Sequence, residues 1–280
     1  MMTTERAHAK INWALDVLEK RADGFHELDM LITSIALHDE LVFEEADGLT
    51  LTVNGRPLPV GRRNLVIRAA EALTRRAGRK LGARIRLTKR IPVRAGLGGG
   101  SADCAATLRA LNRLWRLGLT AHELMEIGAT LGSDVPVCLG LGLARVRGAG
   151  EQLMRLETRL RVPLLILHPG MGLSTPQVFR QWDEEGRSPL GLDLPGAQAA
   201  LVRGDFEAFE RLTGNALEAS AISLMPEVQA AKEQLLAAGA RFAQMSGSGS
   251  AVYGVFGDRQ SARAAKAQLG RRAILTETYP

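Results

Sequence analysis

A run of glycines between a predicted strand and a predicted helix constrains this chain most. Residues 84–88 alternate polar and apolar side chains, which is the pattern of a half-buried strand. Residues 96–101 form a Gly-Leu-Gly-Gly-Gly-Ser loop, and apolar side chains then recur at helical spacing over residues 105–115. Glycine lets backbone amides approach a ligand closely, and a helix start adds unpaired N–H groups and partial positive charge. This order therefore predicts an anion site that suits a nucleotide polyphosphate.

The glycines also have a simpler interpretation, because glycine clusters often mark ordinary turns. The loop lacks the Gly-Lys-Ser/Thr of a Walker motif, and no acidic residue follows at Rossmann spacing. A nucleotide bound here would be held by a loop that is neither a Walker motif nor a Rossmann motif.

Composition is that of a globular protein. The chain has 280 residues, 46% of them hydrophobic and 24% charged, which is enough for one large domain or two ordinary ones. No apolar run could cross a bilayer and the first residues do not form a signal peptide, so we expect a cytoplasmic protein without a membrane partner. Cys104 and Cys138 lie among small and aliphatic residues, which predicts buried free thiols.

The net charge of +6 fits either an RNA-binding module or an enzyme that handles polyanionic small molecules. Aromatic residues make up 4% of the chain, which argues against a surface that stacks bases. We therefore expect no nucleic acid partner. The sequence carries no signal for the oligomeric state.

Strand and helix patterns interleave without a regular βαβ rhythm. We expect strands over residues 9–18, 30–37, 41–43, 49–53, 143–147, 162–168, 242–245, 251–256 and 273–276, and helices after Asn64, over 105–115, after Thr120 and over 261–269. A charged stretch at residues 157–161 indicates a domain boundary. The prediction is an α+β fold of two lobes, residues 1–158 and 159–280.

Asp134 stands in a short polar turn between apolar patterns. Its place just before Pro136 is typical of a carboxylate that caps a helix, and composition alone favours that role. The alternative is a general base, because phosphoryl transfer to an alcohol requires a carboxylate that takes the hydroxyl proton.

Lys10 and Asn12 share one face of a predicted strand, since side chains two residues apart point the same way. A solvated strand face is the ordinary interpretation. A lysine beside Asp134 would instead keep that carboxylate ionised and offset charge on the phosphoryl group. Phe25 and His26 follow a polar turn and are either core residues or a stacking ring beside a histidine that reads a base edge.

Five segments together resemble the GHMP kinase family, which includes galactokinase and the homoserine, mevalonate and phosphomevalonate kinases. In the family's order they are residues 9–12, 20–27, 96–101, 131–136 and 245–249. They are most similar to the branch that phosphorylates 4-diphosphocytidyl-2-C-methyl-D-erythritol in non-mevalonate isoprenoid synthesis. The resemblance extends from Ala7 to the last predicted strand. It implies ATP-dependent phosphorylation of the 2-hydroxyl of that small molecule.

The resemblance also implies a fold and a set of site residues. The N-terminal lobe would be similar to ribosomal protein S5 domain 2 and the C-terminal lobe ferredoxin-like, with ATP and substrate between them. Asp134 would be the catalytic base and Lys10 its cationic neighbour. The ATP-binding residues would be Asn64 near the adenine and, around the phosphates, Pro92, Val93, Arg94, Ala95, Gly96, Leu97, Gly98, Gly99, Gly100, Ser101 and Ala102. The substrate-binding residues would be Asn12, Phe25, His26, Thr175 and Phe179, with the two phenylalanines on either side of the cytosine.

Three positions depart from the family pattern. Phe25 replaces a frequent tyrosine, and Trp13 stands where a smaller aliphatic side chain is common. Ala102 replaces a second serine, so the metal ligands stay unknown and we expect Mg²⁺ to be carried with the nucleotide. Kinases of homoserine or mevalonate are the alternative within the family. Their substrates have no base to stack, whereas residues 23–27 and 175–179 indicate one.

Overall fold

The computed structural model describes residues 2–56 and 58–279, and it divides the chain into two compact units. The first unit comprises Met1–Ala9, Leu37–Val93 and Gly98–Leu141, and the second Lys10–Ala36, Arg94–Leu97 and Gly142–Pro280. Strands β1 (Met2–Lys20) and β2 (His26–Glu45) pair with each other, and each contributes residues to both units. This division follows compactness, so the predicted domain boundary at residue 158 stays a prediction.

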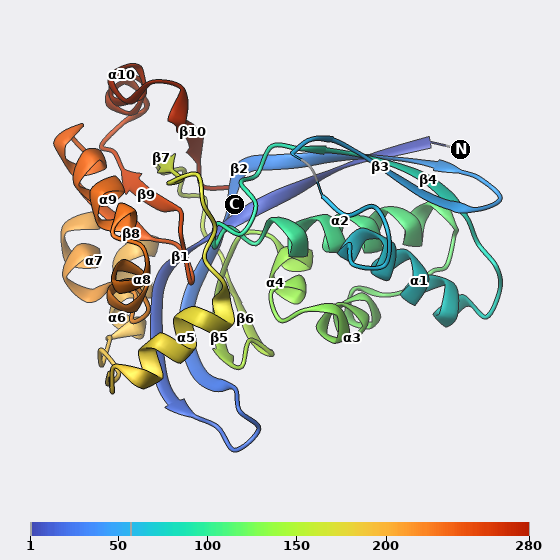
Figure 1. The fold of residues 1–280 in the computed structure, drawn as a ribbon, viewed down its shortest axis with the longest axis horizontal. Coiled ribbons are helices and arrows are strands. Elements are labelled where there is room, and N and C mark those ends of the chain that lie inside the picture. Colours follow the sequence, from blue (N-terminus) through green and yellow to red (C-terminus); the bar gives the residue numbers. More distant parts are fainter. Residues whose placement is uncertain (1, 57, 280) are drawn as a thin grey trace. The chain divides into compact units, whose positions relative to one another are not determined.

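The first unit is a ladder of strands covered by helices. Strand β4 (Ala83–Lys89) runs antiparallel to residues 40–45 of β2 and parallel to β3 (Leu49–Gly55). Its helices are α1 (Leu65–Ala77), α2 (Gly99–Leu114), α3 (Ala121–Leu131) and α4 (Val135–Gly140), and Figure 1 shows α1, α2 and α3 on one side of β3 and β4. Apolar side chains from strands and helices, such as Phe43, Ile85 and Leu108, form a buried core that stabilises this unit.

Local signals set the helix boundaries here. Asn64 caps α1 by accepting a hydrogen bond from the Val66 N–H at 3.0 Å, and Gly78 ends the helix in the left-handed conformation. Helix α3 begins with a capping box in which Thr120 and Glu123 accept hydrogen bonds from each other's backbone N–H groups. The helix starts predicted at Asn64 and Thr120 are confirmed.

The second unit contains an antiparallel sheet with the strand order β10-β7-β9-β8. Its strands are β7 (Pro163–Leu167), β8 (Phe242–Met245), β9 (Val252–Val255) and β10 (Ala273–Glu277). The helices of this unit are α5 (Thr175–Glu184), α6 (Leu194–Arg203), α7 (Phe206–Leu212), α8 (Glu218–Leu224), α9 (Glu227–Ala237), α10 (Arg259–Leu269) and the 3₁₀ turn η1 (Gly270–Arg272). Counted along the chain, the strand order is 4-1-3-2 with helices after the first and third strands. This is the expected ferredoxin-like arrangement.

The second unit also holds the first part of β2, which pairs antiparallel with β5 (Leu143–Gly148), and β5 pairs with β6 (Gln152–Leu156). Trp13 of β1 is 1% exposed and meets the rings of Phe209 and Tyr253 edge to face, each at a centroid distance of 5.5 Å. Edge-to-face aromatic pairs add to the stability gained from burial. The large side chain at position 13 therefore has a packing role.

One predicted pair of strands is a single strand in the structure. The sequence predicts strands at 30–37 and 41–43, but β2 continues from His26 to Glu45. The polar residues at 38–40 interrupt the apolar pattern, yet Asp39 is fully buried because it accepts hydrogen bonds inside the first unit. Cys104 and Cys138 are buried and form no disulfide, as predicted. Over residues 2–56 and 58–279, no helix is both long and apolar enough to cross a membrane.

Candidate functional site

Lys10 and Asn12 lie side by side on β1, as their spacing predicts. Lys10 is 6% exposed and Asn12 is 1% exposed, so the interpretation as a solvated strand face is wrong. The Lys10 Nζ donates a hydrogen bond to Asn12 Oδ1 at 2.6 Å, and the Lys10 backbone N–H donates to the Leu97 carbonyl at 3.0 Å. A buried lysine is costly unless it is paired, which makes this position a candidate for chemistry rather than for solubility.

A serine-glycine loop, residues 246–250, lies between β8 and β9. It contacts both Lys10 and Asn12. The Ser246 hydroxyl accepts a hydrogen bond from the Asn12 N–H at 3.3 Å and donates to the Gly96 carbonyl at 3.0 Å. A Cβ at Gly247 would lie 3.1 Å from the Lys10 Nζ. The loop therefore places backbone against the lysine head group, and a larger residue at position 247 would crowd it.

The first glycine loop meets the second backbone to backbone. Gly96 has φ +74°, and a Cβ there would lie 2.0 Å from the Ser246 carbonyl oxygen. The Ala251 N–H donates to the Ala95 carbonyl at 3.1 Å. Position 96 must be glycine for two reasons, its left-handed backbone and the absence of room for a side chain. The glycines are thus more than a turn, since they allow two loops to touch.

The rest of the first glycine loop leads into α2. Gly98 occupies the N-cap position with φ +66°, and the Ala102 N–H donates to the Gly98 carbonyl at 2.8 Å. Residues 99–101 form the first turn, where helix geometry leaves backbone N–H groups without intrahelical partners. A strand, a glycine loop and a helix start occur in the predicted order, and a helix start of this kind favours anions.

A buried ionic cluster, consisting of Asp39, Lys89 and Asp103, holds both ends of this loop. Lys89 at the end of β4 donates from Nζ to Asp39 and, at 2.7 Å, to Asp103 Oδ2 in the first turn of α2. Asp39 Oδ1 accepts from the backbone N–H groups of Arg90 and, at 2.8 Å, Ile91, which begin the loop. Burial raises the pKa of Asp103 to about 7, although Lys89 opposes the shift. Sequence reasoning missed this cluster, because its three members are far apart along the chain.

Asp134 occupies the N-cap position of α4, but its side chain makes no capping hydrogen bond. Pro136 follows within the first two helical positions, as expected for a helix start. The position of a cap is therefore confirmed, whereas the capping role of the carboxylate is not. A carboxylate that does not serve its own helix remains a candidate for the general base.

Asn64, predicted to lie near the adenine, uses both ends of its amide within the first unit. Its oxygen caps α1, and its NH₂ group donates to the Pro59 carbonyl at 2.8 Å. It is 9% exposed. These bonds give Asn64 a structural role at the start of α1, and its contact with a nucleotide stays a prediction.

The predicted base-binding residues gather around α5 and the start of β2. Phe179 stacks on the His26 ring at a centroid distance of 4.8 Å and an interplanar angle of 25°, while Phe25 is 64% exposed. Thr175, at the start of α5, exchanges a hydrogen bond of 2.7 Å with Ser248 of the serine-glycine loop. The structure thus brings His26 and Phe179 together and links Thr175 to the loop that contacts Lys10. The cytosine sandwich between Phe25 and Phe179 stays a prediction.

Asn215 is a site residue that sequence reasoning missed. Its NH₂ group donates to the carbonyls of Met245 and Gly247 at 2.9 and 2.8 Å, and its oxygen accepts from the Leu217 N–H at 3.0 Å. It is 7% exposed. This side chain holds the serine-glycine loop in place through its hydrogen bonds, and a single asparagine before α8 gives no sequence signal for that role.

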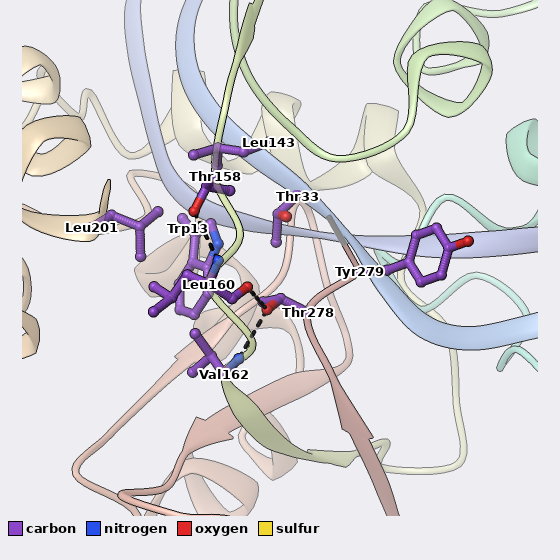
Figure 2. A pocket seen from close by; sticks show the side chains of 9 residues that line it. All are labelled: Trp13, Thr33, Leu143, Thr158, Leu160, Val162, Leu201, Thr278 and Tyr279. Atoms are coloured by element: carbon purple, nitrogen blue, oxygen red, sulfur yellow. Dashed lines mark hydrogen bonds between the residues drawn. The ribbon is translucent and has the colours of Figure 1, made fainter. Parts of the chain in front are cut away.

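A small pocket in the second unit, shown in Figure 2, is a packing gap rather than a ligand site. It is lined by Trp13, Thr33, Leu143, Thr158, Leu160, Val162, Leu201, Thr278 and Tyr279. Its free space is about 10 Å³, which is at the lower limit for holding a single water molecule. The Thr278 hydroxyl donates to the Leu160 carbonyl at 2.8 Å and accepts from the Val162 N–H at 2.9 Å, so this polar group of the lining is satisfied within the protein.

Comparison with known proteins identifies the family. The model of the GHMP kinases N terminal domain matches residues 64–142, and that of the GHMP kinases C terminal matches residues 197–274. The chain is 45% identical to the 4-diphosphocytidyl-2-C-methyl-D-erythritol kinase of Pelotomaculum thermopropionicum, over 100% of this chain and 99% of that protein. It is 46% identical to the protein of the same name from Moorella thermoacetica, over 98% and 95% of the two chains.

Solved structures agree with this assignment. A crystal structure of 4-(cytidine 5'-diphospho)-2C-methyl-D-erythritol kinase matches with a TM-score of 0.85 and 38% identity, over 99% of this chain and 100% of that one. The crystal structure of L. major mevalonate kinase in complex with R-mevalonate has a TM-score of 0.76 at 18% identity, over 100% and 97%, and shows a shared fold. The chain belongs to the GHMP kinase family and, within it, to the group of the 4-diphosphocytidyl-2-C-methyl-D-erythritol kinases.

Proposed function

We propose that this chain transfers the γ-phosphoryl group of ATP to the 2-hydroxyl of 4-diphosphocytidyl-2-C-methyl-D-erythritol. The observation that carries the proposal is 45% identity, along the whole chain, with a relative named as the kinase of this compound. GHMP kinases use ATP as the phosphate donor, so the donor follows from family membership. The reaction is a step of isoprenoid precursor synthesis.

The backbone of the first glycine loop would hold the ATP phosphates. The loop from Pro92 to Ala102 ends in the first turn of α2, where N–H groups without intrahelical partners and the helix dipole favour an anion. The buried cluster of Asp39, Lys89 and Asp103 supports this role, because it fixes both ends of the loop before a nucleotide arrives. A preorganised loop loses little conformational freedom on binding.

Asp134 would act as the general base. Its carboxylate would accept the proton of the 2-hydroxyl while the hydroxyl oxygen forms a bond to the γ-phosphorus. The bond between the γ-phosphorus and the bridging oxygen would break, and ADP would leave with the electron pair of that bond. Such a proton transfer typically accelerates a reaction by about 10²–10⁴-fold.

Lys10 would supply positive charge as the phosphoryl group moves. A fixed cation in a site with little water stabilises developing negative charge more strongly than the same cation in solution. The hydrogen bond from Lys10 Nζ to Asn12 Oδ1 and the backbone of the serine-glycine loop limit the positions its head group can take. Lys10 thus contributes charge from a nearly fixed place.

Magnesium would be held mainly by oxygen atoms of the nucleotide. Among the described residues no cluster of three or more histidine, cysteine, aspartate or glutamate side chains could hold a metal ion. Position 102 is an alanine and offers no side-chain oxygen. When bound, the ion would neutralise charge on the ATP phosphates. A cytoplasmic location and the absence of a nucleic acid partner remain expectations from the sequence, and the oligomeric state is open.

The first experiment is an assay of the purified protein with magnesium-ATP and each of three alcohols, namely the cytidyl substrate, homoserine and mevalonate. We expect ADP to form with the cytidyl substrate and the product to be one phosphate group heavier by mass spectrometry. ADP formation with homoserine or mevalonate instead would keep the family and overturn the substrate.

The second experiment tests the base. Asp134→Asn should lower kcat by about 10²-fold or more, in line with the loss of a general base, while the protein stays folded by circular dichroism. Glu126→Gln, which removes an exposed carboxylate from α3, is the matched control and should leave kcat unchanged. Full activity of Asp134→Asn would overturn the assigned role.

A further inference from the structure

The His26 ring is held on three sides within the second unit. Phe179 stacks on its face, and Trp182 meets it edge to face at a centroid distance of 5.8 Å. Its Nε2 lies 2.8 Å from Asp183 Oδ1. Phe179, Trp182 and Asp183 all belong to α5. Trp182 and Asp183 follow Phe179 by three and four residues, so the three side chains lie on one face of the helix, and a single helix fixes the ring. His26 is 8% exposed.

Lys20 binds the Asp183 carboxylate and helps to keep it ionised. Its Nζ donates a hydrogen bond to Asp183 Oδ2 at 2.6 Å, while Oδ1 faces His26. Burial raises the pKa of Asp183, but Lys20 and His26 together lower it by more, through hydrogen bonds and through their charge. The net shift of the pKa is therefore downward. An ionised carboxylate accepts hydrogen bonds and cannot donate them. The Nε2 atom of His26 must therefore carry a proton.

The hydrogen bond from His26 Nε2 to Asp183 determines whether the other ring nitrogen, Nδ1, donates or accepts a hydrogen bond. A neutral imidazole has one N–H, so a proton on Nε2 leaves Nδ1 as an acceptor. Among residues 2–56 and 58–279, none forms a hydrogen bond with His26 Nδ1. On the base edge of cytosine, the 4-amino group is the donor, whereas N3 and O2 accept. An acceptor at Nδ1 therefore matches the amino group of cytosine and opposes the 4-oxygen of uracil.

We propose that Asp183 is a positioning residue that fixes the tautomer of His26, and that this makes the site select cytosine over uracil. The inference rests on the proposed function, because it takes the base of the substrate to lie at His26. Lys20 takes part in the same hydrogen-bond chain, since it holds the carboxylate that orients the histidine. Asp183 itself acts through His26.

The variant Asp183→Asn should reverse the hydrogen bond. Lys20 requires an acceptor, so the new amide should turn its oxygen to Lys20 and its NH₂ group to His26 Nε2. An NH₂ group can only donate, which forces the histidine proton onto Nδ1. The site would then present a donor, which suits the 4-oxygen of uracil and opposes the amino group of cytosine.

The test compares kcat/KM for the cytidyl substrate and for its uridine counterpart in four proteins. The wild type should favour the cytidyl compound, and Asp183→Asn should reduce the ratio of the two values by on the order of tenfold to a hundredfold. Lys20→Met should keep the preference, because Asp183 still accepts from Nε2. The double variant should recover much of the ratio, because without Lys20 the amide can turn its oxygen back to His26.

Glu184→Gln is the matched control, because it removes an exposed carboxylate from the same helix and should leave the ratio unchanged. If Asp183→Asn lowers kcat/KM for both compounds equally, Asp183 has a structural role and the proposal is wrong. If its reduced ratio is not recovered in the double variant, the orienting role of Lys20 is wrong and the proposal fails in that form.

A second measurement needs no substrate. The ¹⁵N resonances of the His26 ring at pH 8, assigned by comparison with His26→Ala, report which nitrogen carries the proton. We expect Nε2–H in the wild type and Nδ1–H in Asp183→Asn, whereas Nδ1–H in the wild type would overturn the proposal. Because this result is independent of turnover, a protein that phosphorylates neither compound would refute the proposed function while the tautomer is still decided.

Discussion

Replacing Asp103 by asparagine tests whether a buried carboxyl makes this fold lose stability as the pH rises. The Asp103 side chain is 3% exposed and accepts a hydrogen bond from Lys89 Nζ through Oδ2, while its buried Oδ1 has no hydrogen-bond partner in the described part of the chain. An asparagine can keep the bond to Lys89 through its amide oxygen. The substitution therefore removes the titration and conserves the shape.

The magnitude follows from the pKa. Burial raises the pKa of Asp103 from 3.8 to about 7 in the folded protein, whereas the unfolded chain keeps the ordinary value. Between these two values the folded state holds a proton that the unfolded state has lost, so stability falls as the pH rises. A difference of about 3 pH units, at about 1.4 kcal/mol each, gives on the order of 4 kcal/mol.

The wild type should lose this stabilisation between about pH 4 and pH 7, and the Asp103→Asn variant should not. The amide NH₂ group is buried without a partner, which should cost about 1–3 kcal/mol at every pH. The variant should therefore gain stability relative to the wild type as the pH rises from 5 to 8, and should be the more stable of the two at pH 8. For a chain of this size, 1 kcal/mol corresponds to about 2 °C in melting temperature.

The assay is the melting temperature of both proteins at pH 5, 6, 7 and 8 in buffers of equal ionic strength, with urea unfolding at pH 5 and 8 as a check. Glu233→Gln, an exposed change on α9, controls for the loss of a carboxylate elsewhere. Parallel pH profiles for wild type and Asp103→Asn would refute the reasoning, since they would mean that Asp103 titrates alike in folded and unfolded chains.

Two further substitutions test the contact between the glycine loops. Gly96→Ala should abolish activity and lower the melting temperature, because its Cβ would lie 2.0 Å from the Ser246 carbonyl oxygen in a left-handed backbone; unchanged kcat would contradict this. Asn215→Ala should destabilise the protein by about 2–4 kcal/mol in urea unfolding, because it leaves the buried carbonyls of Met245 and Gly247 without their donor, and a loss under 1 kcal/mol would contradict this.

Features encoded locally could be predicted from the sequence. Asn64, the Thr120–Glu123 capping box and the glycines before α2 each act on residues within a few positions, so their patterns are legible without a fold. The shared face of Lys10 and Asn12 is equally local, because it depends on strand periodicity alone. The assignment of functions to these residues came from resemblance to a family rather than from periodicity.

Contacts between distant segments could not be predicted. Asp39 interrupts the apolar pattern of β2 and reads as a strand end, yet it is buried because Lys89, fifty positions away, donates to it. Asn215 and Asp183 are ordinary polar residues in sequence, and their roles depend on which loop or ring the fold brings to them. The hydrogen-bond partner of such a polar residue cannot be predicted from the sequence until it is known which strands and helices lie next to each other.

The serine-glycine loop explains why residues assigned to different tasks should respond together to mutation. Within the second unit it contacts Asn12 and Gly96 through Ser246 and Thr175 through Ser248, and Asn215 holds it in place. A shift of this loop therefore moves backbone against Lys10, the phosphate loop and the start of α5 at once. Residues in one hydrogen-bond network generally show non-additive effects, so double variants across this loop should lose less than the sum of the single losses. The same coupling gives the loop one well-defined position, which a nearly fixed Lys10 requires.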